Sequence, residues 1–230
     1  MGDIAEKIYS IAVDGPSGAG KSSLAKAIAA ELHILYVDTG AIYRTIGCYA
    51  RRKGVETADP EAIIALLPEV EIGMCYDAQG LQHMLLHGED VTEEIRLPEM
   101  SLYASAVSAI PEVRAFLLEM QRDFARKSSV IMDGRDIGTV VLPHADVKIF
   151  LKADVEVRAR RREIELQERG TPRPYEQVLE EMRQRDYNDT HRSAAPLRAA
   201  EDAVIVDTSD LDFRQSKEKL LEIIREKVGL

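Results

Sequence analysis

Residues 14–22 read Asp-Gly-Pro-Ser-Gly-Ala-Gly-Lys-Ser and directly follow the largely apolar run Ile8–Val13. Glycines at 15, 18 and 20 allow backbone conformations closed to other residues, so successive N–H groups can turn around phosphate oxygens. A helix predicted over 23–32 directs the positive end of its dipole at the same anion. A strand, this loop and a helix in that order predict a phosphate-binding P-loop and nucleoside triphosphate chemistry.

The loop residues have distinct expected roles in ATP binding. Lys21 supplies a point charge, and Ser22 can place its hydroxyl on a magnesium ion. The alternative is a glycine-rich turn that joins a strand to a helix and binds nothing. We expect ATP to be held by Gly15, Pro16, Ser17, Gly18, Ala19, Gly20, Lys21, Ser22 and Ser23.

The composition is that of a globular protein, with 230 residues, 45% hydrophobic and 30% charged. This length favours one main domain with an insertion over two equal domains. A formal net charge of -10 argues against a surface that attracts nucleic acid or membranes as a whole. Any anion site must therefore be local.

Cys48 and Cys75 share no metal-ligand spacing and are too few for a disulfide framework, which fits a reducing compartment. We expect both to be small buried residues. The N-terminus is acidic where a signal peptide would be basic, and no run of about 18 apolar residues occurs. These features predict a cytoplasmic protein.

Three apolar runs end in an aspartate, at Asp14, Asp38 and Asp133. Two further runs, 147–151 and 203–206, have the same character, and helical segments lie between them. This alternation predicts a parallel sheet with helices on both faces. Ligands of such sheets bind beyond the carboxyl ends of the strands, where these aspartates are expected.

Residues 68–96 interrupt the alternation with a hairpin pattern, in which two apolar runs flank residues 77–80. An antiparallel unit inserted here either shapes a ligand site or is a structural appendage. On either side of it, Pro60 and Pro111 are expected to open helices, the second of which runs to about Arg126.

An arginine-rich segment follows Asp154, a residue suited to cap a helix. Arg158, Arg161 and Arg162 are spaced to share one face, and a Gly/Pro-rich stretch at 168–174 follows. Such a helix is either a solvated face or a mobile lid that closes on phosphates with bidentate donors.

Two more groups bear on the site. Arg185, Asp189 and Arg192 are spaced i, i+4, i+7, which fits either a salt-bridge ladder or a clamp for phosphate and sugar. Asp133 stands where P-loop proteins place a carboxylate linked to magnesium, and Arg135 and Asp136 follow at the cleft mouth. A plain Asp-Gly turn is the alternative for this second group.

Five segments together resemble the bacterial cytidylate kinases. The resemblance is specific to this family because the segments occur in order over nearly the whole chain. They are residues 15–22, Asp38-Thr-Gly-Ala-Ile-Tyr-Arg44, Gly88-Glu-Asp-Val91, Asp133-Gly-Arg-Asp-Ile-Gly-Thr-Val-Val141 and Arg185-Asp-Tyr-Asn-Asp189. The resemblance implies that ATP with Mg²⁺ donates its γ-phosphoryl group to CMP or dCMP.

The resemblance also implies residue roles. Those at the cytosine are Thr39, Ser105, Arg114 and Asp136; those at the acceptor phosphate are Arg44, Arg135 and Arg185; those at the sugar are Asp189 and Arg192. Arg161 and Arg162 fall in the lid. The expected catalytic groups are Lys21, Arg135, Arg161, Arg162 and Arg185, and the expected metal-linked groups are Ser22 and Asp133, the latter directly or through water.

Physical chemistry supports part of this assignment. Cytosine presents an N4 amino donor beside the N3 and O2 acceptors, which complement the carboxylate of Asp136 and the guanidinium of Arg114. Uracil reverses the pattern at positions 3 and 4. Phosphoryl transfer needs positioning and charge neutralisation, so no general base is assigned. The five histidines are expected to be structural or exposed.

We therefore predict an α/β P-loop kinase with a parallel sheet core, an inserted antiparallel nucleotide-acceptor unit and a short arginine-rich lid. The expected core comprises 1–38, 105–157 and 175–230, the acceptor-binding region 39–104 and the lid 158–174. We expect a monomer that binds ATP and CMP or dCMP but neither nucleic acid nor membranes. The rivals are a kinase for another nucleotide or metabolite and a nucleotide-dependent regulatory switch.

Overall fold

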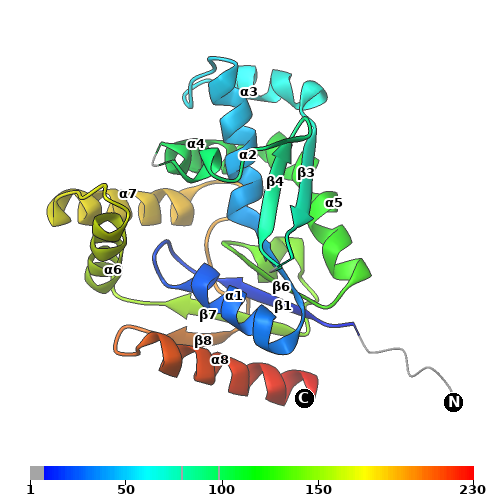
Figure 1. The fold of residues 1–230 in the computed structure, drawn as a ribbon, viewed down its shortest axis with the longest axis vertical. Coiled ribbons are helices and arrows are strands. Elements are labelled where there is room, and N and C mark those ends of the chain that lie inside the picture. Colours follow the sequence, from blue (N-terminus) through cyan, green and yellow to red (C-terminus); the bar gives the residue numbers. More distant parts are fainter. Residues whose placement is uncertain (1–7, 79, 98) are drawn as a thin grey trace, which may run out of the picture.

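A computed structural model describes residues 8–78, 80–97 and 99–230 (Figure 1). Its main sheet has five parallel strands in the order β2-β6-β1-β7-β8. The strands are β1 (Ser10–Asp14), β2 (Leu35–Asp38), β6 (Val130–Gly134), β7 (Val147–Lys152) and β8 (Val204–Asp207). The prediction of a parallel sheet is confirmed.

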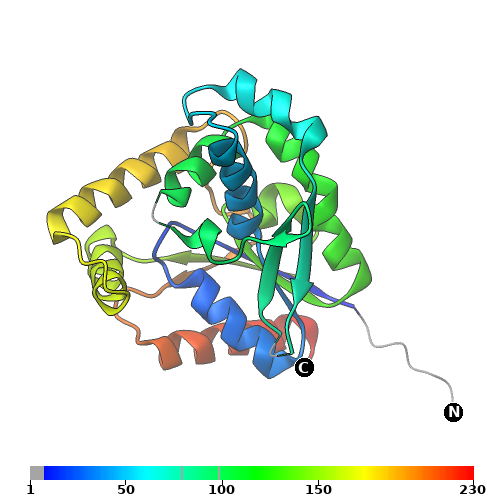
Figure 2. The ribbon, with the colours of Figure 1, turned by 45° about the horizontal axis from the view of Figure 1, so that its top comes forward.

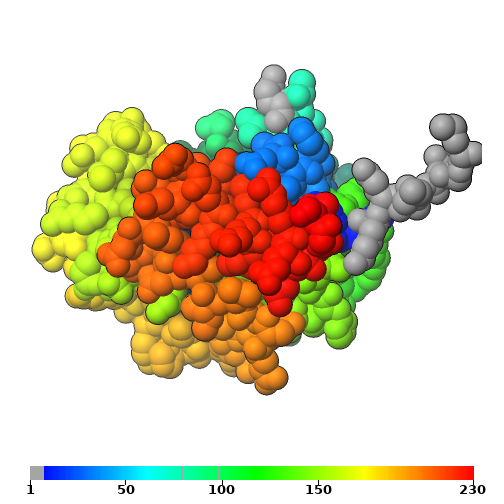
Figure 3. Space-filling view, turned by 90° about the horizontal axis from the view of Figure 1, so that it is seen from below, coloured from blue at the N-terminus to red at the C-terminus, as the bar shows by residue number. Residues whose placement is uncertain are grey.

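Helices cover both faces of this sheet. Ile11 and Val13 of β1 pack in one core cluster, and Ala12 between them packs in the other, because successive side chains of a strand point to opposite faces. Figure 1 shows α8 along the bottom and α2 above the sheet, and Figure 3 shows the lower face formed largely by the C-terminal segment. The lower layer contains α1 (Lys21–Leu32) and α8 (Phe213–Val228); the upper contains α2 (Thr39–Arg52), α4 (Met100–Ser108) and α5 (Pro111–Lys127).

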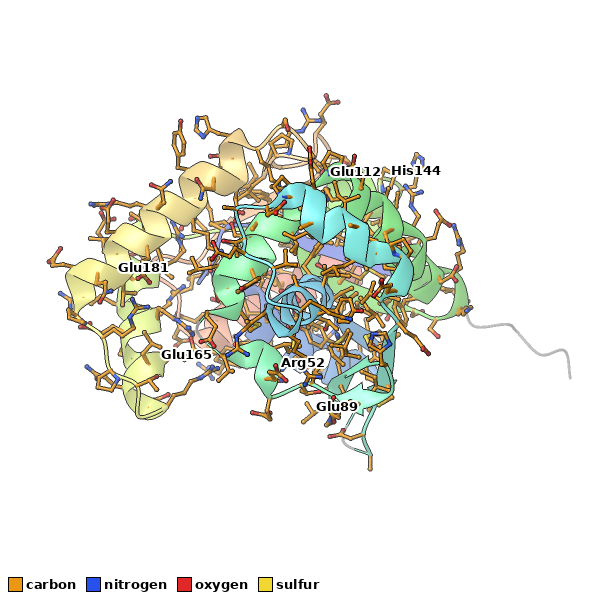
Figure 4. The ribbon with its side chains drawn as sticks, turned by 90° about the horizontal axis from the view of Figure 1, so that it is seen from above. Arg52, Glu89, Glu112, His144, Glu165 and Glu181 are labelled. Carbon is orange, nitrogen blue, oxygen red and sulfur yellow. The ribbon has the colours of Figure 1, made fainter. Side chains whose placement is uncertain are left out.

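The insertion after α2 contains the expected hairpin. It comprises α3 (Pro60–Leu66) and a separate antiparallel sheet of β3 (Ile72–Tyr76), β4 (Gln82–Leu86) and β5 (Glu89–Asp90). The short third strand was not predicted. Arg52 at the end of α2 contacts Glu89 at 2.7 Å, and Figure 4 shows these two side chains beside each other. The ion pair ties the small sheet to α2.

The arginine-rich segment lies in α6 (Val155–Glu168), which pairs with α7 (Tyr175–His191). The two helices project from the side of the sheet (Figure 2). Asp154 precedes α6 as expected, but its side chain makes no capping hydrogen bond. Instead its backbone N–H donates to the hydroxyl oxygen of Ser209 at 3.0 Å.

The structure corrects the expectation for one cysteine. Cys48 is buried in α2, but Cys75 is exposed on β3. The small sheet covers the core with one face only, so alternate residues of β3 point outward. Among the described residues, no helix is both long and apolar enough to cross a membrane.

His83 of β4 lies between two carboxylates. Its Nδ1 is 2.8 Å from Asp90 and its Nε2 is 3.4 Å from Asp77, and hydrogen bonding to Asp90 and then to Asp77 raises the pKa of the imidazole above 6.5. Stabilisation from a raised histidine pKa is fully present below the unfolded pKa and is lost as pH rises through the folded one.

We therefore expect His83→Gln to lower the thermal unfolding temperature more at about pH 6 than at about pH 9. Unfolding of both proteins at the two pH values tests this. An equal decrease at both would mean that the ion pairs of His83 do not contribute to stability.

Candidate functional site

The aspartates that end the strands lie together at one edge of the sheet. Asp38 of β2 pairs in register with Asp133 of β6, and Asp14 of β1 pairs with Gly134. All three therefore lie at the carboxyl ends of adjacent parallel strands, as predicted. The P-loop leaves the sheet at this same edge.

The P-loop has the backbone that its glycines predict. Gly15 has φ +147°, and a Cβ there would lie 2.1 Å from the carbonyl oxygen of Leu151, so no other residue fits. Lys21 is 5% exposed, and its Nζ donates to the carbonyl oxygen of Pro16 at 2.7 Å. Burial, and then the positive charge of Arg135, lower the pKa of Lys21. An anion in the loop would favour its charged form.

Ser22 and Asp133 lie in contact at the start of α1. The Ser22 hydroxyl donates to Asp133 Oδ2 at 2.8 Å, and the Tyr36 hydroxyl donates to Oδ1 at 2.8 Å. Burial, and then the charge of Asp38, raise the pKa of Asp133. A hydroxyl and a carboxylate beside a phosphate loop fit Mg²⁺, which is usually held by one or two such ligands together with substrate phosphates and water. A cation here would also relieve the buried negative charge.

Asp14 organises the loop that carries Arg135 and Asp136. Its carboxylate accepts from the backbone N–H groups of Ile137 and Gly138, both at 2.8 Å. Burial raises the pKa of Asp14 to about 6, against these two hydrogen bonds, which lower it. The residue thus fixes the chain that follows β6. Sequence inspection placed Asp14 at the sheet edge without this role.

Asp136 lies between two arginines, although 22 and 56 residues separate it from them in the chain. It forms an ion pair with Arg114, and Arg192 Nη2 lies 3.6 Å from its other oxygen. Ser108 joins the group, since its carbonyl accepts from Arg114 Nη1 and its hydroxyl from Arg192 Nη1. Ser108 was missed because it carries no motif; its hydroxyl also bonds the carbonyl of Ser105.

Thr39 lies against the same loop. It is 3% exposed, and its hydroxyl donates to the carbonyl of Asp133 at 2.7 Å. Its oxygen retains the capacity to accept a hydrogen bond. Ser105 is linked to the arginine-carboxylate group through its carbonyl, which accepts from Ser108, and Thr39 is linked to the loop of Asp136 through the carbonyl of Asp133.

A second arginine group faces Lys21. Arg135 Nε donates to Asp189 at 2.7 Å, and Arg44 Nη2 donates to Asp38 at 2.8 Å. Burial lowers the pKa of Arg185 to about 10, and the positive charges of Arg135, Arg44 and Arg162 contribute to that decrease. Three guanidinium groups thus lie close enough to Arg185 to repel its charge.

Buried donors without a hydrogen bond occur in both arginine groups. Among the described residues, the buried side-chain nitrogens without a hydrogen bond are Arg44 Nε, Arg185 Nε and Arg192 Nη2. Buried donors nearly always have a hydrogen bond in folded proteins, so each of these nitrogens indicates a missing acceptor. An anionic ligand with several oxygens would supply it.

The two lid arginines of α6, Arg161 and Arg162, have different hydrogen-bond partners. Arg161 donates to the carbonyl of Thr208 at 2.6 Å, at the end of β8, and Arg162 donates to Glu165 at 2.7 Å on its own helix. Arg162 still contributes to the charge around Arg185, whereas Arg161 is held by the loop before α8. Of the two, only Arg162 therefore lies among the arginines that surround Arg185.

The small sheet contacts this site through Gln82, a residue that the sequence pattern did not single out. Its side chain accepts from the backbone N–H of Asp38 at 2.7 Å and donates to the carbonyl of Asp38 at 3.3 Å. Tyr76, its partner across the hairpin, donates to the carbonyl of Tyr36 at 2.8 Å. Because β2 is an edge strand, these side chains pair backbone groups that the sheet leaves open.

We expect Gln82→Leu to destabilise the protein by about 1–3 kcal/mol, because it leaves backbone groups of Asp38 unpaired. The acceptor KM should also rise, since Asp38 holds Arg44. Urea unfolding and steady-state kinetics test both effects, with the exposed neighbour change Leu81→Ala as the control. An unchanged KM in a folded Gln82→Leu protein would limit the small sheet to a structural role.

Comparisons with known proteins relate the chain to one enzyme family. A family model described as cytidylate kinase matches residues 11–226. The chain is 48% identical to the cytidylate kinase of Caldicellulosiruptor saccharolyticus, over 97% of this chain and 98% of that protein. It is also 48% identical to the cytidylate kinase of Carboxydothermus hydrogenoformans, over 94% and 97%. An uncharacterised protein from Eubacterium ventriosum has a similar fold, with a TM-score of 0.52 at 12% identity, over 94% and 98%.

Proposed function

The chain belongs to the cytidylate kinase family, and we propose that it transfers the γ-phosphoryl group of ATP to CMP or dCMP, giving ADP and CDP or dCDP. The observation that carries the proposal is the presence of buried guanidinium nitrogens without a hydrogen bond in both arginine groups: Arg44 Nε and Arg185 Nε in one, and Arg192 Nη2 beside Asp136 in the other. A donor loop and an acceptor site for a second anion are what a phosphoryl transfer between two nucleotides needs.

ATP is the donor, and its phosphates would lie in the loop 15–22 at the N-terminus of α1. Ser22 and Asp133 would hold Mg²⁺, which would neutralise phosphate charge and orient the β- and γ-phosphates. Lys21 would release the carbonyl of Pro16 and donate to the phosphate oxygens instead.

The acceptor base would bind beside Asp136. This carboxylate would accept from the N4 amino group of cytosine, and Arg114 would donate to O2 or N3. Thr39 and Ser105 would complete the base contacts. Uracil would place its O4 against the carboxylate and its N3–H against the arginine, leaving both pairs unmade.

The acceptor phosphate would lie among Arg44, Arg135 and Arg185, and Asp189 with Arg192 would contact the sugar. Burial and, to a lesser extent, its neighbours lower the pKa of Arg185, so a phosphate here would relieve their mutual repulsion. The arginines would neutralise charge on both sides of the transferred group without a dedicated base.

The remaining assignments concern the larger parts of the chain. Residues 39–104 would form the acceptor-binding region and 158–174 the lid, with Arg161 and Arg162 among its donors. We also propose a monomer, because the P-loop lysine and the arginines assigned to the acceptor phosphate approach one another within a single chain.

ADP formation with Mg-ATP and a panel of CMP, dCMP, UMP, AMP and GMP tests the proposal. Strong stimulation by CMP and dCMP is expected. Preference for another acceptor would retain the kinase but overturn the cytosine site. ATP hydrolysis at the same rate with and without an acceptor would favour a nucleotide-dependent switch.

A further inference from the structure

Arg158 is a buried arginine of α6 to which the proposed reaction gives no role. It is 4% exposed, and its guanidinium binds three separate parts of the molecule. Nε donates to the carbonyl of Ala153 at 2.8 Å, and Nη1 donates to the carbonyl of Ser17 in the P-loop at 2.9 Å. Asp186 of α7 accepts from Nη1 at 3.2 Å and from Nη2 at 2.6 Å. The side chain therefore joins α6, α7 and the P-loop.

Packing at the P-loop agrees with this connection. Gly18 has φ +75°, and a Cβ there would lie 2.6 Å from Cε of Met182 and 3.3 Å from Cβ of Arg158. Met182 belongs to α7 and Arg158 to α6, so both helices pack against the P-loop at Gly18. A shift of either helix along the loop would disturb this contact.

Asp186 occupies a sensitive position on α7. It follows Arg185 directly and lies one turn before Asp189, the partner of Arg135. Arg185 and Asp189 are the groups that we assign to the acceptor. A contact that holds Asp186 therefore sets the rotation and height of the helix that presents them.

We infer that Arg158 is a positioning residue that couples the ATP-binding loop to α7, so that a filled P-loop sets Arg185 and Asp189 for the acceptor. This inference rests on the proposed function. Arg158 acts through Ser17 and Asp186 in this role. Lysine carries the same charge but lacks the planar fork that reaches three carbonyl and carboxylate partners at once.

A second arginine-acid pair between the same helices provides a matched control. Arg183 of α7 donates to Glu156 of α6 at 2.9 Å, but the side chains are 52% and 56% exposed and neither is hydrogen-bonded to the P-loop. Arg183→Lys changes the same chemical group without touching the connection that involves Ser17.

The experiment compares Arg158→Lys, Asp186→Asn, their double variant and Arg183→Lys. Calorimetry measures CMP affinity with and without a non-hydrolysable ATP analogue, and kinetics give kcat and KM. We expect the analogue to raise CMP affinity about 5-fold or more in the wild-type protein and less than about 2-fold in Arg158→Lys. We also expect kcat/KM to fall about 10-fold or more, with no further loss in the double variant.

Two results would overturn the inference: no coupling between the analogue and CMP in the wild-type protein, or full coupling in Arg158→Lys. A variant with only a stability defect would lower the unfolding temperature and keep the coupling. If Arg158→Lys fails to fold, Asp186→Asn decides between the same outcomes. If the wild-type protein phosphorylates another nucleotide instead of CMP, the proposed function fails, and the coupling is measured with that acceptor.

Discussion

Replacing Lys21 by Met is expected to lower kcat about 10²–10³-fold for every acceptor, the usual cost of removing one group that stabilises transition-state charge. Lys21 is buried in the P-loop, and its Nζ bonds a loop carbonyl that a bound phosphate would replace. Methionine keeps the length and apolar contacts of the side chain but has no charge. Steady-state kinetics with saturating ATP and CMP measure the loss.

The position of Lys21 also predicts the stability of this variant. Burial, and then the charge of Arg135, lower the pKa of Lys21, so the folded protein gains little from its charge when no phosphate is bound. Lys21→Met should therefore unfold at a temperature close to that of the wild-type protein while turnover collapses. Normal turnover in a folded variant would remove Lys21 from phosphoryl transfer.

The parts of the fold that sequence patterns predicted are those specified locally. Apolar runs that end in aspartate predicted the parallel strands, and the spacing of the glycines predicted the P-loop. Each pattern is complete within about ten residues, so it can be recognised without knowledge of distant contacts. The hairpin was predicted for the same reason. Its third strand, Glu89–Asp90, was not, since it is too short and polar to show a period.

Several contacts that join distant parts of the chain were not predicted. Gln82 binds Asp38 across 44 residues, and Arg192 binds Ser108 across 84. Arg158 binds Ser17 across 141. In each case one partner is a backbone group or a residue without a motif. Only the packing of the helices and the small sheet brings such partners together.

The arginine-rich segment shows this limit most directly. Helical spacing predicted one face shared by Arg158, Arg161 and Arg162, but the three side chains have different surroundings. Spacing fixes where Cβ atoms lie on a helix, whereas long side chains follow their partners. Arg158 is buried in spite of its charge because the carboxylate of Asp186 and the P-loop carbonyl of Ser17 accept its hydrogen bonds.

Replacing Asp136 by Ala is expected to reduce the preference for CMP over UMP on the order of 10²-fold or more, because a site that pairs a buried polar group discriminates by up to about 10⁴ against a base that cannot pair with it. Asp136 is 4% exposed and lies between Arg114 and Arg192. The KM for CMP should rise while ATP binding changes little, since the residue lies outside the P-loop. Competition between CMP and UMP measures the ratio of kcat/KM directly.

Asp136→Asn separates base readout from loss of the ion pair. Both variants remove the negative charge that Arg114 and Arg192 share, so both should weaken CMP binding. Only the amide can turn a donor toward O4 of uracil while its oxygen faces an arginine. UMP should therefore be used better by Asp136→Asn than by Asp136→Ala. If both variants keep the wild-type ratio of CMP to UMP turnover, Asp136 orients the arginines, and the base is recognised by other groups.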